Sequence, residues 1–306
     1  MARYKIIVNP TSGRGEGGRS VPAIEENLKR LGLDYDLVLT ERPLHAIELA
    51  KEAVADGYDV VVAAGGDGTA NEVLNGLVLA KEQGVGEAAY YVIGVGRGND
   101  LAFGMKMPAD LDEACQALAE DKRMIVDVGK VTGGLFPDGR YFGNGVGIGF
   151  DAVVGFEAVK LKRLSGFPSY IVAALKTIFL YYKAPKVEIE VNGKTLTEKT
   201  LMVSVMNGRR MGGGFMMAPE GENDDGVFDL CIAKEVGKLR IFTLIPRFMA
   251  GTQATEEPII TDRMEKIVVR AIEGSLPAHA DGETLCEAGQ ELVMEILPKQ
   301  IEVIYS

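Results

Sequence analysis

Residues 59–72 of the chain read DVVVAAGGDGTANE. The run Asp59–Ala63 is typical of a buried strand, and the glycine-rich stretch Gly65–Thr69 follows it and opens a helix predicted over Thr69–Lys81. The same alternation predicts strands at Tyr4–Val8, Tyr35–Leu39 and Tyr90–Val95, and helices near Val21–Leu31 and Ala46–Ala55. Strands alternating with helices of this length indicate parallel βαβ units. The first half is therefore predicted to be an α/β domain with an open parallel sheet.

The second half has a different pattern, in which short apolar runs are separated by turns. This pattern indicates a β-rich sandwich domain with inserted helices near Asp151–Arg163, Ser169–Tyr182 and Val236–Met249. Its predicted strands are Tyr141–Phe150, Lys186–Val191, Leu201–Asn207, Phe228–Ala233, Ile267–Ile272, Leu292–Leu297 and Ile301–Tyr305. We expect domains at 1–127 and 128–306, with an active-site cleft between them and a last strand near 300–306 that returns to the first domain.

The composition is that of a folded globular protein. The 306 residues include 33 Lys and Arg against 44 Asp and Glu, a net charge of −11, which argues against a partner made of duplex nucleic acid. The 3 cysteines form no C-x-x-C pair, so a reducing cytoplasm fits best. The apolar stretch Tyr170–Tyr182 is interrupted by Lys176 and is shorter than the ~18 residues that a membrane-spanning helix needs.

The loop Gly65–Thr69 is suited to an anion. Glycines allow a phosphate to approach the backbone, and the N–H groups at a helix start favour negative charge. Asp67 would repel a phosphate unless a divalent metal bridges them, so the loop predicts a Mg²⁺-nucleotide. The alternative is a tight strand-to-helix turn in which Asp67 is a helix cap.

Two further strand ends have the same chemistry, namely the loop that begins at Asn9-Pro10-Thr11-Ser12-Gly13 and the loop Gly94–Asp100. Ligands of open α/β sheets bind beyond the carboxyl ends of the strands. Three such loops on one sheet therefore predict a polyphosphate site.

These motifs resemble those of the diacylglycerol kinase catalytic-domain family, especially the bacterial lipid kinases. The resemblance continues through Phe142-Gly143-Asn144, Gly149-Phe150-Asp151-Ala152, Asn207-Gly208-Arg209, Gly212-Gly213-Gly214-Phe215, Ala218-Pro219, Asp224-Asp225-Gly226 and Asp281-Gly282-Glu283. It implies an ATP- and Mg²⁺-dependent enzyme that transfers the γ-phosphate to a lipid hydroxyl, with diacylglycerol or a related glycerolipid as the favoured acceptor. The nucleotide-binding residues predicted from the loops and the resemblance are Asn9, Ser12, Gly13, Thr40, Gly65, Gly66, Asp67, Gly68, Thr69, Asn71, Glu72, Arg97 and Asn99.

Arg97 is a departure from the family, which commonly has threonine there. A guanidinium at this position could hold a phosphate through two hydrogen bonds. For catalysis, the resemblance implies that Glu283 is the general base and that Asp281 and Asp100 are its neighbours, holding Mg²⁺ or the substrate hydroxyl. The alternative for Asp281-Gly282 is an ordinary hairpin turn with solvated acids.

The resemblance also implies a second, structural Mg²⁺ site at Glu222, Asp225 and Val227, which as residues alone would form only a polar turn. The segment 155–186 has six basic residues against one acid and several aromatic side chains. It is either a contact with anionic lipid at the inner membrane face, which would make the protein peripheral, or a pair of core helices with a solvated basic face. A homodimer is compatible with the sequence.

Other functions stay open at this point. A sphingoid-base kinase or an NAD kinase would share the glycine-Asp loop, and a nucleotide-binding sensor without catalysis would have no need of Glu283.

Overall fold

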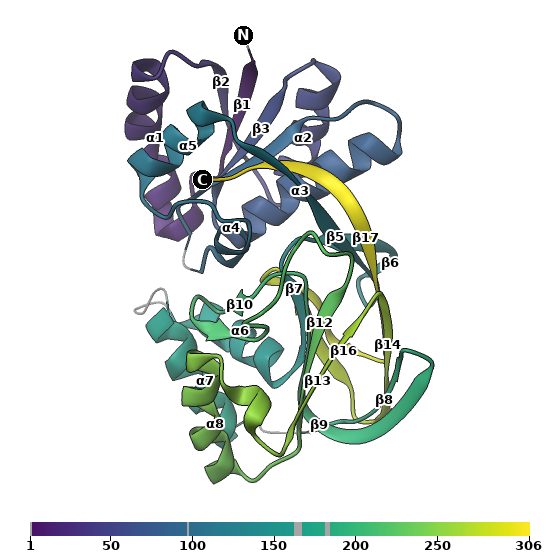
Figure 1. Ribbon diagram of the computed structural model, residues 1–306. Coiled ribbons are helices and arrows are strands. Elements are labelled where there is room, and N and C mark those ends of the chain that lie inside the picture. The colour runs from purple at the N-terminus through teal and green to yellow at the C-terminus, as the bar shows by residue number, and fades with distance from the viewer. Residues whose placement is uncertain (1, 97, 162–166, 181–183) are drawn as a thin grey trace. The chain divides into compact units, whose positions relative to one another are not determined.

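The computed structural model describes residues 2–96, 98–161, 167–180 and 184–306. The chain divides into two compact units (Figure 1). The N-terminal unit comprises Met1–Val128 and Lys299–Ser306, and the C-terminal unit comprises Gly129–Pro298. The chain passes from one to the other within strands β5 (Arg123–Gly133) and β17 (Glu291–Ile304).

The N-terminal unit has a sheet of parallel strands in the order β4-β3-β1-β2, and the end of β17 pairs with β4 in parallel. The strands are β1 (Arg3–Val8), β2 (Asp34–Leu39), β3 (Val60–Gly65) and β4 (Ala89–Gly94). The helices are α1 (Ser12–Arg30), α2 (His45–Ala55), α3 (Asp67–Glu82), α4 (Asp100–Gly104) and α5 (Leu111–Glu120). Figure 1 shows α1 and α5 on one side of this sheet and α2 and α3 on the other.

Burial explains why the central strands read as continuous apolar runs. Every residue of β3 is buried, as are the first five residues of β4, because helices cover both faces of the sheet. Helix α5 begins at a conventional cap, since Asp110 Oδ1 accepts hydrogen bonds from the N–H groups of Asp112 (3.0 Å) and Glu113 (3.1 Å).

The C-terminal unit is rich in antiparallel strands. Along its main path the order is β16-β15-β7-β9-β8-β14-β17, with β12 paired to β9 and β13, and β5 paired to β6 and β17. The further strands are β6 (Phe136–Phe142), β7 (Gly145–Gly149), β8 (Lys186–Val191), β9 (Lys194–Met206), β10 (Arg210–Met211), β11 (Phe215–Met216), β12 (Phe228–Lys234), β13 (Ile259–Met264), β14 (Lys266–Glu273), β15 (Leu276–Ala280) and β16 (Glu283–Gly289). The helices are α6 (Phe150–Lys160), α7 (Phe167–Leu180), α8 (Lys238–Ala250) and the 3₁₀ turn Gln253–Thr255.

Strand β9 forms the link between the two layers of this unit. Its first half pairs with β8, and its second half pairs with β7 and β12. Side chains such as Ile189, Val203 and Met294 belong to one buried apolar cluster inside the sandwich. Met202 and Met206, which alternate with Val203 and Val205 along β9, belong to a second cluster that includes side chains of α7 and α8.

The expected fold class is confirmed: a mixed sheet with parallel core strands and helices precedes a β-rich domain. Several elements differ from expectation. Strand β9 begins at Lys194 rather than at Leu201, and the sequence pattern did not predict β5, β13, β15, β16, α4 or α5. Helix α1 begins at Ser12 rather than near Val21, and its first turn contains left-handed residues, including Arg14 at φ 63°. The sequence pattern did not indicate a helix start at Ser12, because the residues that follow are rich in glycine, which is a poor helix former.

The predicted strand Tyr141–Phe150 is two strands, β6 and β7, separated by a turn at Gly143-Asn144. The two predicted strands at the C-terminus are one strand, β17. Proline lacks an N–H donor, yet Pro298 is tolerated because β17 changes its partner around this point, from β14 at residues 291–295 to β4 at Val303.

Candidate functional site

The carboxyl ends of β1, β3 and β4 lie at one edge of the N-terminal sheet. The register places Val8 beside Ala64, and Gly65 beside Gly94. Beyond the strands, the Asn9 N–H donates to the Ala64 carbonyl (3.0 Å). The Val95 N–H donates to the Gly65 carbonyl (2.9 Å). The three loops singled out in the sequence therefore begin side by side.

Asn9 connects the first loop to the second. Its Nδ2 donates to Thr69 Oγ1 (3.0 Å), and its Oδ1 accepts from the N–H (3.0 Å) and hydroxyl (2.9 Å) of Thr11. Ser12 Oγ donates to the Asn9 carbonyl (2.9 Å). A Cβ at Gly13 would lie 2.5 Å from the Val95 carbonyl oxygen, so the first loop also lies against the third.

Asp67 connects the second loop to the third. Its Oδ2 accepts from the Asn99 N–H (2.9 Å), and its Oδ1 accepts from the Leu101 N–H (3.1 Å). These bonds fix the start of α4, where Asp100 is buried. Asp67 is thus a helix cap, as the alternative interpretation proposes, but it caps α4 rather than α3, the helix to which it belongs.

Two close approaches explain the glycines at this edge. A Cβ on Gly96 would lie 2.3 Å from Gly66 Cα, so only glycine allows the second and third loops to touch. A Cβ on Gly98 would lie 2.9 Å from Asp67 Oδ2 and 3.1 Å from Asp100 Oδ2. The two carboxylates therefore border one small space next to Gly98.

The start of α3 faces the same edge. Its N-cap residue is Gly66, which has no side chain and so provides no side-chain cap hydrogen bond. Backbone N–H groups and the positive end of the helix dipole favour an anion at such a helix start. A phosphate group would thus be stabilised at the loop made of Gly65, Gly66, Asp67, Gly68 and Thr69.

Glu72 has a structural task that the sequence did not predict. Its Oε1 accepts from the Leu44 N–H (3.0 Å) and its Oε2 from the Ala46 N–H (3.1 Å), so it caps α2 from a neighbouring helix. Leu44 is the N-cap residue and has no acceptor of its own. A helix start without Ser, Thr, Asp or Asn was the available signal that another residue supplies the acceptor.

The remaining predicted residues of this unit are placed as follows. Thr40 follows β2, and its N–H donates to the Val8 carbonyl (2.8 Å). Asn71 is fully buried on α3, where its carbonyl accepts from Asn75 Nδ2 (2.8 Å). Asn99 Oδ1 accepts from the Gly96 N–H (3.0 Å). Arg97 lies outside the described residues.

In the C-terminal unit, Asp281 holds a turn. Its buried carboxylate accepts from the N–H groups of Gly143 (2.8 Å), Asn144 (3.0 Å) and Gly145 (2.9 Å). Asp281 and Gly282 both have positive φ, 47° and 85°, and connect β15 to β16 as a two-residue hairpin. The hairpin is therefore present, but its acid is buried and hydrogen-bonded rather than solvated.

Glu283 is the first residue of β16 and is paired with Ala280 across the hairpin. Its side chain is partly exposed, in contrast to that of Asp281. Of the two acids in this motif, Glu283 is thus the one that solvent or a substrate can reach.

The predicted structural metal loop contains ion pairs. Glu222 Oε1 accepts from Arg209 Nη2 (3.0 Å), and Asp225 pairs with Arg263. The Val227 N–H donates to Asp225 Oδ1 (3.2 Å). Among the described residues, no group of three or more His, Cys, Asp or Glu side chains is placed to hold a metal ion. The metal at this loop stays a prediction.

A row of residues that includes the half-buried His279 crosses the C-terminal sheet, and the sequence did not predict it. Adjacent strands place His279 beside Gly147, Gly147 beside Ser204, and Ser204 beside Cys231. A Cβ at Gly147 would lie 2.2 Å from Asp151 Oδ2 and 2.6 Å from His279 Nε2, so these two polar atoms face the same point.

Burial is the main cause of the pKa shifts of Asp151 and His279. It raises the pKa of Asp151 from 3.8 to about 7, against the opposing effect of hydrogen bonds from the Ala152 N–H and the Ser204 hydroxyl. It lowers the pKa of His279 from 6.5 to about 4. The Nδ1 of His279 is buried and has no hydrogen-bond partner among the residues that the structure describes. Asp151 belongs to the motif Gly149-Phe150-Asp151-Ala152, but the sequence could not show that this first turn of α6 lies against Gly147.

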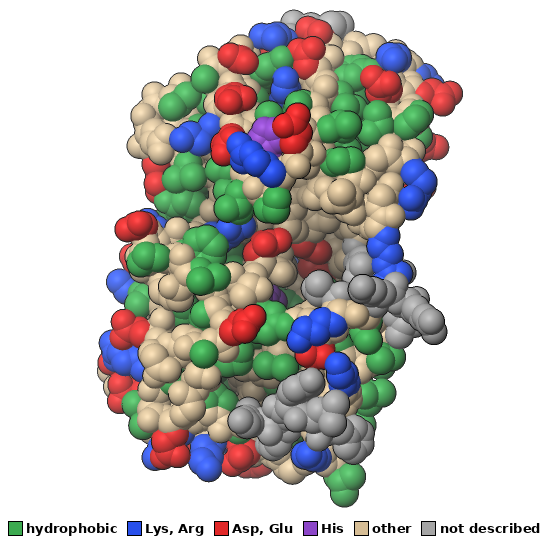
Figure 2. All heavy atoms as spheres, turned by 180° about the vertical axis from the view of Figure 1, so that it is seen from behind, with side chains coloured by type: hydrophobic (Ala, Val, Ile, Leu, Met, Phe, Trp, Pro, Cys, Tyr) green, Lys and Arg blue, Asp and Glu red, His purple; other side chains and the backbone are tan. Residues whose placement is uncertain are grey.

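The basic segment 155–186 is partly neutralised. Lys160 and Lys176 both pair with Glu157, whose side chain is buried. Lys162, Arg163 and Lys183 lie outside the described residues. No helix among the described residues is long and apolar enough to cross a membrane. On the face drawn in Figure 2, acidic and basic side chains are interspersed.

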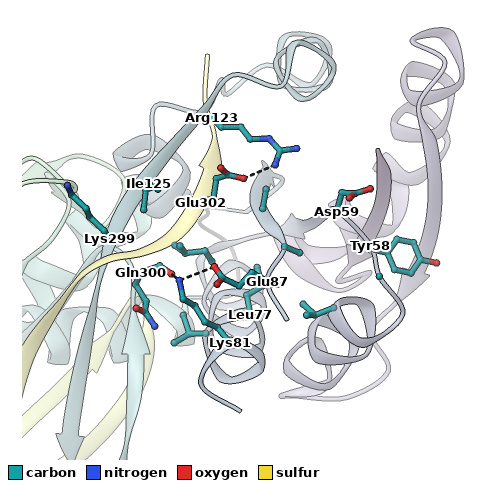
Figure 3. Close-up of a pocket in the computed structure, with 16 residues that line it drawn as sticks. Tyr58, Asp59, Leu77, Lys81, Glu87, Arg123, Ile125, Lys299, Gln300 and Glu302 are labelled. Carbon is teal, nitrogen blue, oxygen red and sulfur yellow. Dashed lines mark hydrogen bonds and ion pairs between the residues drawn. The ribbon is translucent and has the colours of Figure 1, made fainter. Parts of the chain in front are cut away.

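A pocket of about 420 Å³ lies in the N-terminal unit, near the amino ends of β3 and β4 and so away from the glycine-rich loops. The charged residues at its mouth pair with one another: Lys81 with Glu87 (3.0 Å) and Arg123 with Glu302 (2.6 Å) (Figure 3). The lining also includes Asp59 and Lys299, which these two ion pairs do not involve, and the pocket is separate from the edge where the three loops meet.

Comparisons with known proteins cover nearly the whole chain. Residues 3–131 match the family model described as diacylglycerol kinase catalytic domain, and residues 144–305 match the YegS C-terminal NAD kinase beta sandwich-like domain. The chain is 29% identical to a diacylglycerol kinase of Bacillus subtilis (strain 168), covering 92% of this chain and 90% of the relative. It is 28% identical to one of Staphylococcus aureus (strain MRSA252), covering 92% and 86%. A crystal structure of a diacylglycerol kinase from Bacillus anthracis str. Sterne shares the fold, with a TM-score of 0.74 at 22% identity over 100% of this chain and 97% of that one.

Proposed function

We propose a reaction from one premise: the chain belongs to the diacylglycerol kinase catalytic domain family of lipid kinases and has the YegS-type C-terminal domain of that family. The proposed reaction transfers the γ-phosphate of ATP to the hydroxyl of diacylglycerol or a related glycerolipid. The bond between the γ-phosphorus and the bridging oxygen of ADP breaks, and a bond from the lipid oxygen to that phosphorus forms. A base accepts the proton of the hydroxyl group.

One observation supports the nucleotide half of this proposal most strongly. Three loops meet at one edge of the parallel sheet, joined by the bonds from Asn9 to Thr69 and from Asn99 and Leu101 to Asp67. Their glycines leave the backbone accessible, and the uncapped start of α3 adds a positive dipole. We propose that the triphosphate binds at this edge.

We propose that a magnesium ion binds next to Gly98. Carboxylate oxygens of Asp67 and Asp100 border the space there, and a single Cβ would fill it. Mg²⁺ in kinases is held by one or two carboxylates together with phosphate oxygens and waters, so two acids are a sufficient protein contribution. When bound there, Mg²⁺ would neutralise charge on the phosphates. Asp67 would also keep the third loop in place through its two amide bonds.

For the hydroxyl proton we propose Glu283. A lipid hydroxyl is a weak nucleophile, and a carboxylate that accepts its proton speeds the transfer. The partial exposure of Glu283 supports this assignment, whereas the three amide bonds of Asp281 make that residue a positioning group for the turn 143–145.

The test is transfer of label from γ-labelled ATP to a panel of acceptors: diacylglycerol, monoacylglycerol, phosphatidylglycerol, a sphingoid base and NAD. We expect label in diacylglycerol. Label in the sphingoid base or NAD instead would identify that compound, rather than diacylglycerol, as the acceptor. ATP binding without label in any acceptor would favour a nucleotide-binding sensor.

Glu283→Gln should lower turnover at least ~100-fold with an unchanged KM for ATP, as loss of general base catalysis predicts. Glu287→Gln is the matched control, because Glu287 is an exposed acid on the same strand. Equal activity of the two variants would remove Glu283 as the base.

A further inference from the structure

The pocket near the amino ends of β3 and β4 is a cavity that the proposed kinase reaction does not use (Figure 3). Its walls come from the C-terminal parts of α2 and α3, the residues before β4, the start of β5 and the end of β17. Its volume of about 420 Å³ lies in the range that is typical of small-molecule sites. Every residue of its lining belongs to the N-terminal unit, so the pocket is complete within that unit.

Part of the lining is apolar. Val54, Leu77 and Ile301 are buried there, whereas Ile125 keeps 50% of its surface exposed. Covering such an exposed apolar side chain removes it from water, which is favourable. The pocket therefore suits a ligand with an aliphatic body.

The mouth of the pocket is charged, and its ion pairs present carboxylates to solvent. The side chain of Glu87 is 68% exposed, whereas that of its partner Lys81 is 33% exposed. Arg123 is 30% exposed and pairs with two acids, Asp121 and Glu302, which are 35% and 42% exposed. The cation is the more buried partner in each pair, so a ligand that enters from solvent meets carboxylate oxygens first.

One end of the pocket has further negative charge. Asp59 is exposed, and its Oδ2 accepts a hydrogen bond from the Arg3 N–H (2.8 Å), while no described residue donates to its Oδ1. Helix α2 ends just before Asp59 and has no basic residue in its last turn. The negative end of the helix dipole is thus not compensated from within α2. Both features favour a cation at this end.

Lys299 is the opposing charge in the lining. Unlike Lys81 and Arg123, it pairs with no acid among the described residues. Figure 3 shows Lys299 at the opposite end of the pocket from Asp59, with Glu302 between them. A cationic ligand is therefore favoured at the Asp59 end and in the middle of the pocket, and excluded from the end that holds Lys299.

We propose that this pocket binds a linear aliphatic polyamine. One ammonium group would pair with Asp59, and another would pair with the exposed carboxylates of Glu87 and Glu302. The methylene chain between the two ammonium groups would cover Leu77 and Ile125. A polyamine matches both properties of the pocket, because its ammonium groups donate to carboxylates and its methylene groups are apolar. A metal ion would match only the charge.

The test is isothermal titration calorimetry of the full chain with spermidine. Nucleotide is left out, because a polyamine is attracted to the charge of ATP itself. We expect saturable binding that weakens as salt is raised. Butylamine, which has one ammonium group, should bind at least tenfold more weakly. An excess of Mg²⁺ at the same ionic strength should not displace spermidine.

Asp59→Asn should lower the affinity for spermidine at least tenfold. The amide keeps an oxygen acceptor for the Arg3 N–H, so the variant should melt within a few degrees of the wild type. Asp56→Asn is the matched control, because Asp56 is an exposed acid at the end of α2 that does not line the pocket. It should bind spermidine as the wild type does.

Ile125→Lys is a second variant, which places a cation in the pocket from an exposed position. It should also lose at least tenfold in affinity for spermidine. In addition, spermidine should raise the melting temperature of the wild type and of Asp56→Asn, but not that of Asp59→Asn or Ile125→Lys.

Three results would overturn the inference. They are absence of spermidine binding by the wild type, equal affinity in the wild type and Asp59→Asn, and an equal loss in Asp59→Asn and Asp56→Asn, which would indicate unspecific attraction to acids. Binding of inorganic phosphate that Lys299→Gln abolishes would assign the pocket to anions and also refute it. None of these measurements uses ATP or a lipid, so they are independent of the proposed reaction.

Discussion

The carboxylate of Asp67 accepts a hydrogen bond of 2.9 Å from the backbone N–H of Asn99, 32 residues further along the chain. The same carboxylate accepts a second bond from the Leu101 N–H. The Asp67 side chain thus holds the neighbouring loop in position through two hydrogen bonds. Asp67 therefore has a structural task in addition to the metal-binding task proposed for it.

Asp67→Asn tests both tasks. An amide can keep one acceptor but presents an N–H₂ group to the other loop amide, so we expect a loss of about 1–3 kcal/mol in the free energy of unfolding, measured in urea. Affinity for Mg²⁺-ATP should fall at least tenfold. Asp110→Ala is the control, because it removes a carboxylate that also accepts two backbone amides, at the start of α5. It should lose comparable stability with unchanged nucleotide affinity; equal nucleotide affinity in both variants would reduce Asp67 to a cap.

Glu72→Ala should destabilise the N-terminal unit by about 1–2 kcal/mol, as the loss of a helix cap does. Glu72→Gln keeps one oxygen acceptor and should be milder. Chemical denaturation monitored by circular dichroism measures both values. If Glu72→Ala left stability unchanged but abolished nucleotide binding, the carboxylate would act on the ligand rather than on Leu44 and Ala46.

Asp281→Asn and Glu283→Gln should separate stability from chemistry. Asp281 accepts three backbone amides inside the protein, so Asp281→Asn should cost about 3 kcal/mol or more in unfolding free energy as well as activity. Glu283→Gln should leave the unfolding free energy within about 0.5 kcal/mol of wild type. A stable but inactive Asp281→Asn protein would show that Asp281 is a catalytic residue instead.

The half-buried pair Asp151 and His279 predicts opposing effects of pH on stability. The folded pKa of Asp151, about 7, lies above its ordinary 3.8, so its stabilising contribution is complete below about pH 4 and is lost as pH rises toward 7. The folded pKa of His279, about 4, lies below its ordinary 6.5, so its contribution is complete above about pH 6.5 and is lost as pH falls toward 4.

Between pH 4 and 6.5 the two slopes therefore oppose each other in the wild type. Asp151→Asn removes the first slope, and its unfolding free energy should rise with pH more steeply than that of the wild type in this window. His279→Asn should show the reverse. Urea denaturation at a series of pH values measures this, and parallel profiles for all three proteins would contradict the assignment.

Much of the fold followed from local pattern. Apolar runs such as Val60–Ala64 and the glycines after them predicted both the parallel sheet and the edge at which its loops meet. The sequence could not show that Glu72 caps a helix 26 residues earlier or that Asp281 holds a turn 138 residues away, because these bonds depend on tertiary packing. Nor could it show that His279 and Ser204 flank Gly147, since strand order decides this.

The most direct test of the nucleotide site is a calorimetric titration with a non-hydrolysable ATP analogue, with and without Mg²⁺. Gly98→Ala would place a Cβ against Asp67 and Asp100, whereas the matched Gly155→Ala would place one in open space on α6. We predict that wild type and Gly155→Ala bind the analogue more tightly with Mg²⁺, and that Gly98→Ala loses at least tenfold in affinity together with the Mg²⁺ dependence. Wild-type affinity and Mg²⁺ dependence in Gly98→Ala, or no binding by the wild type, would contradict the account.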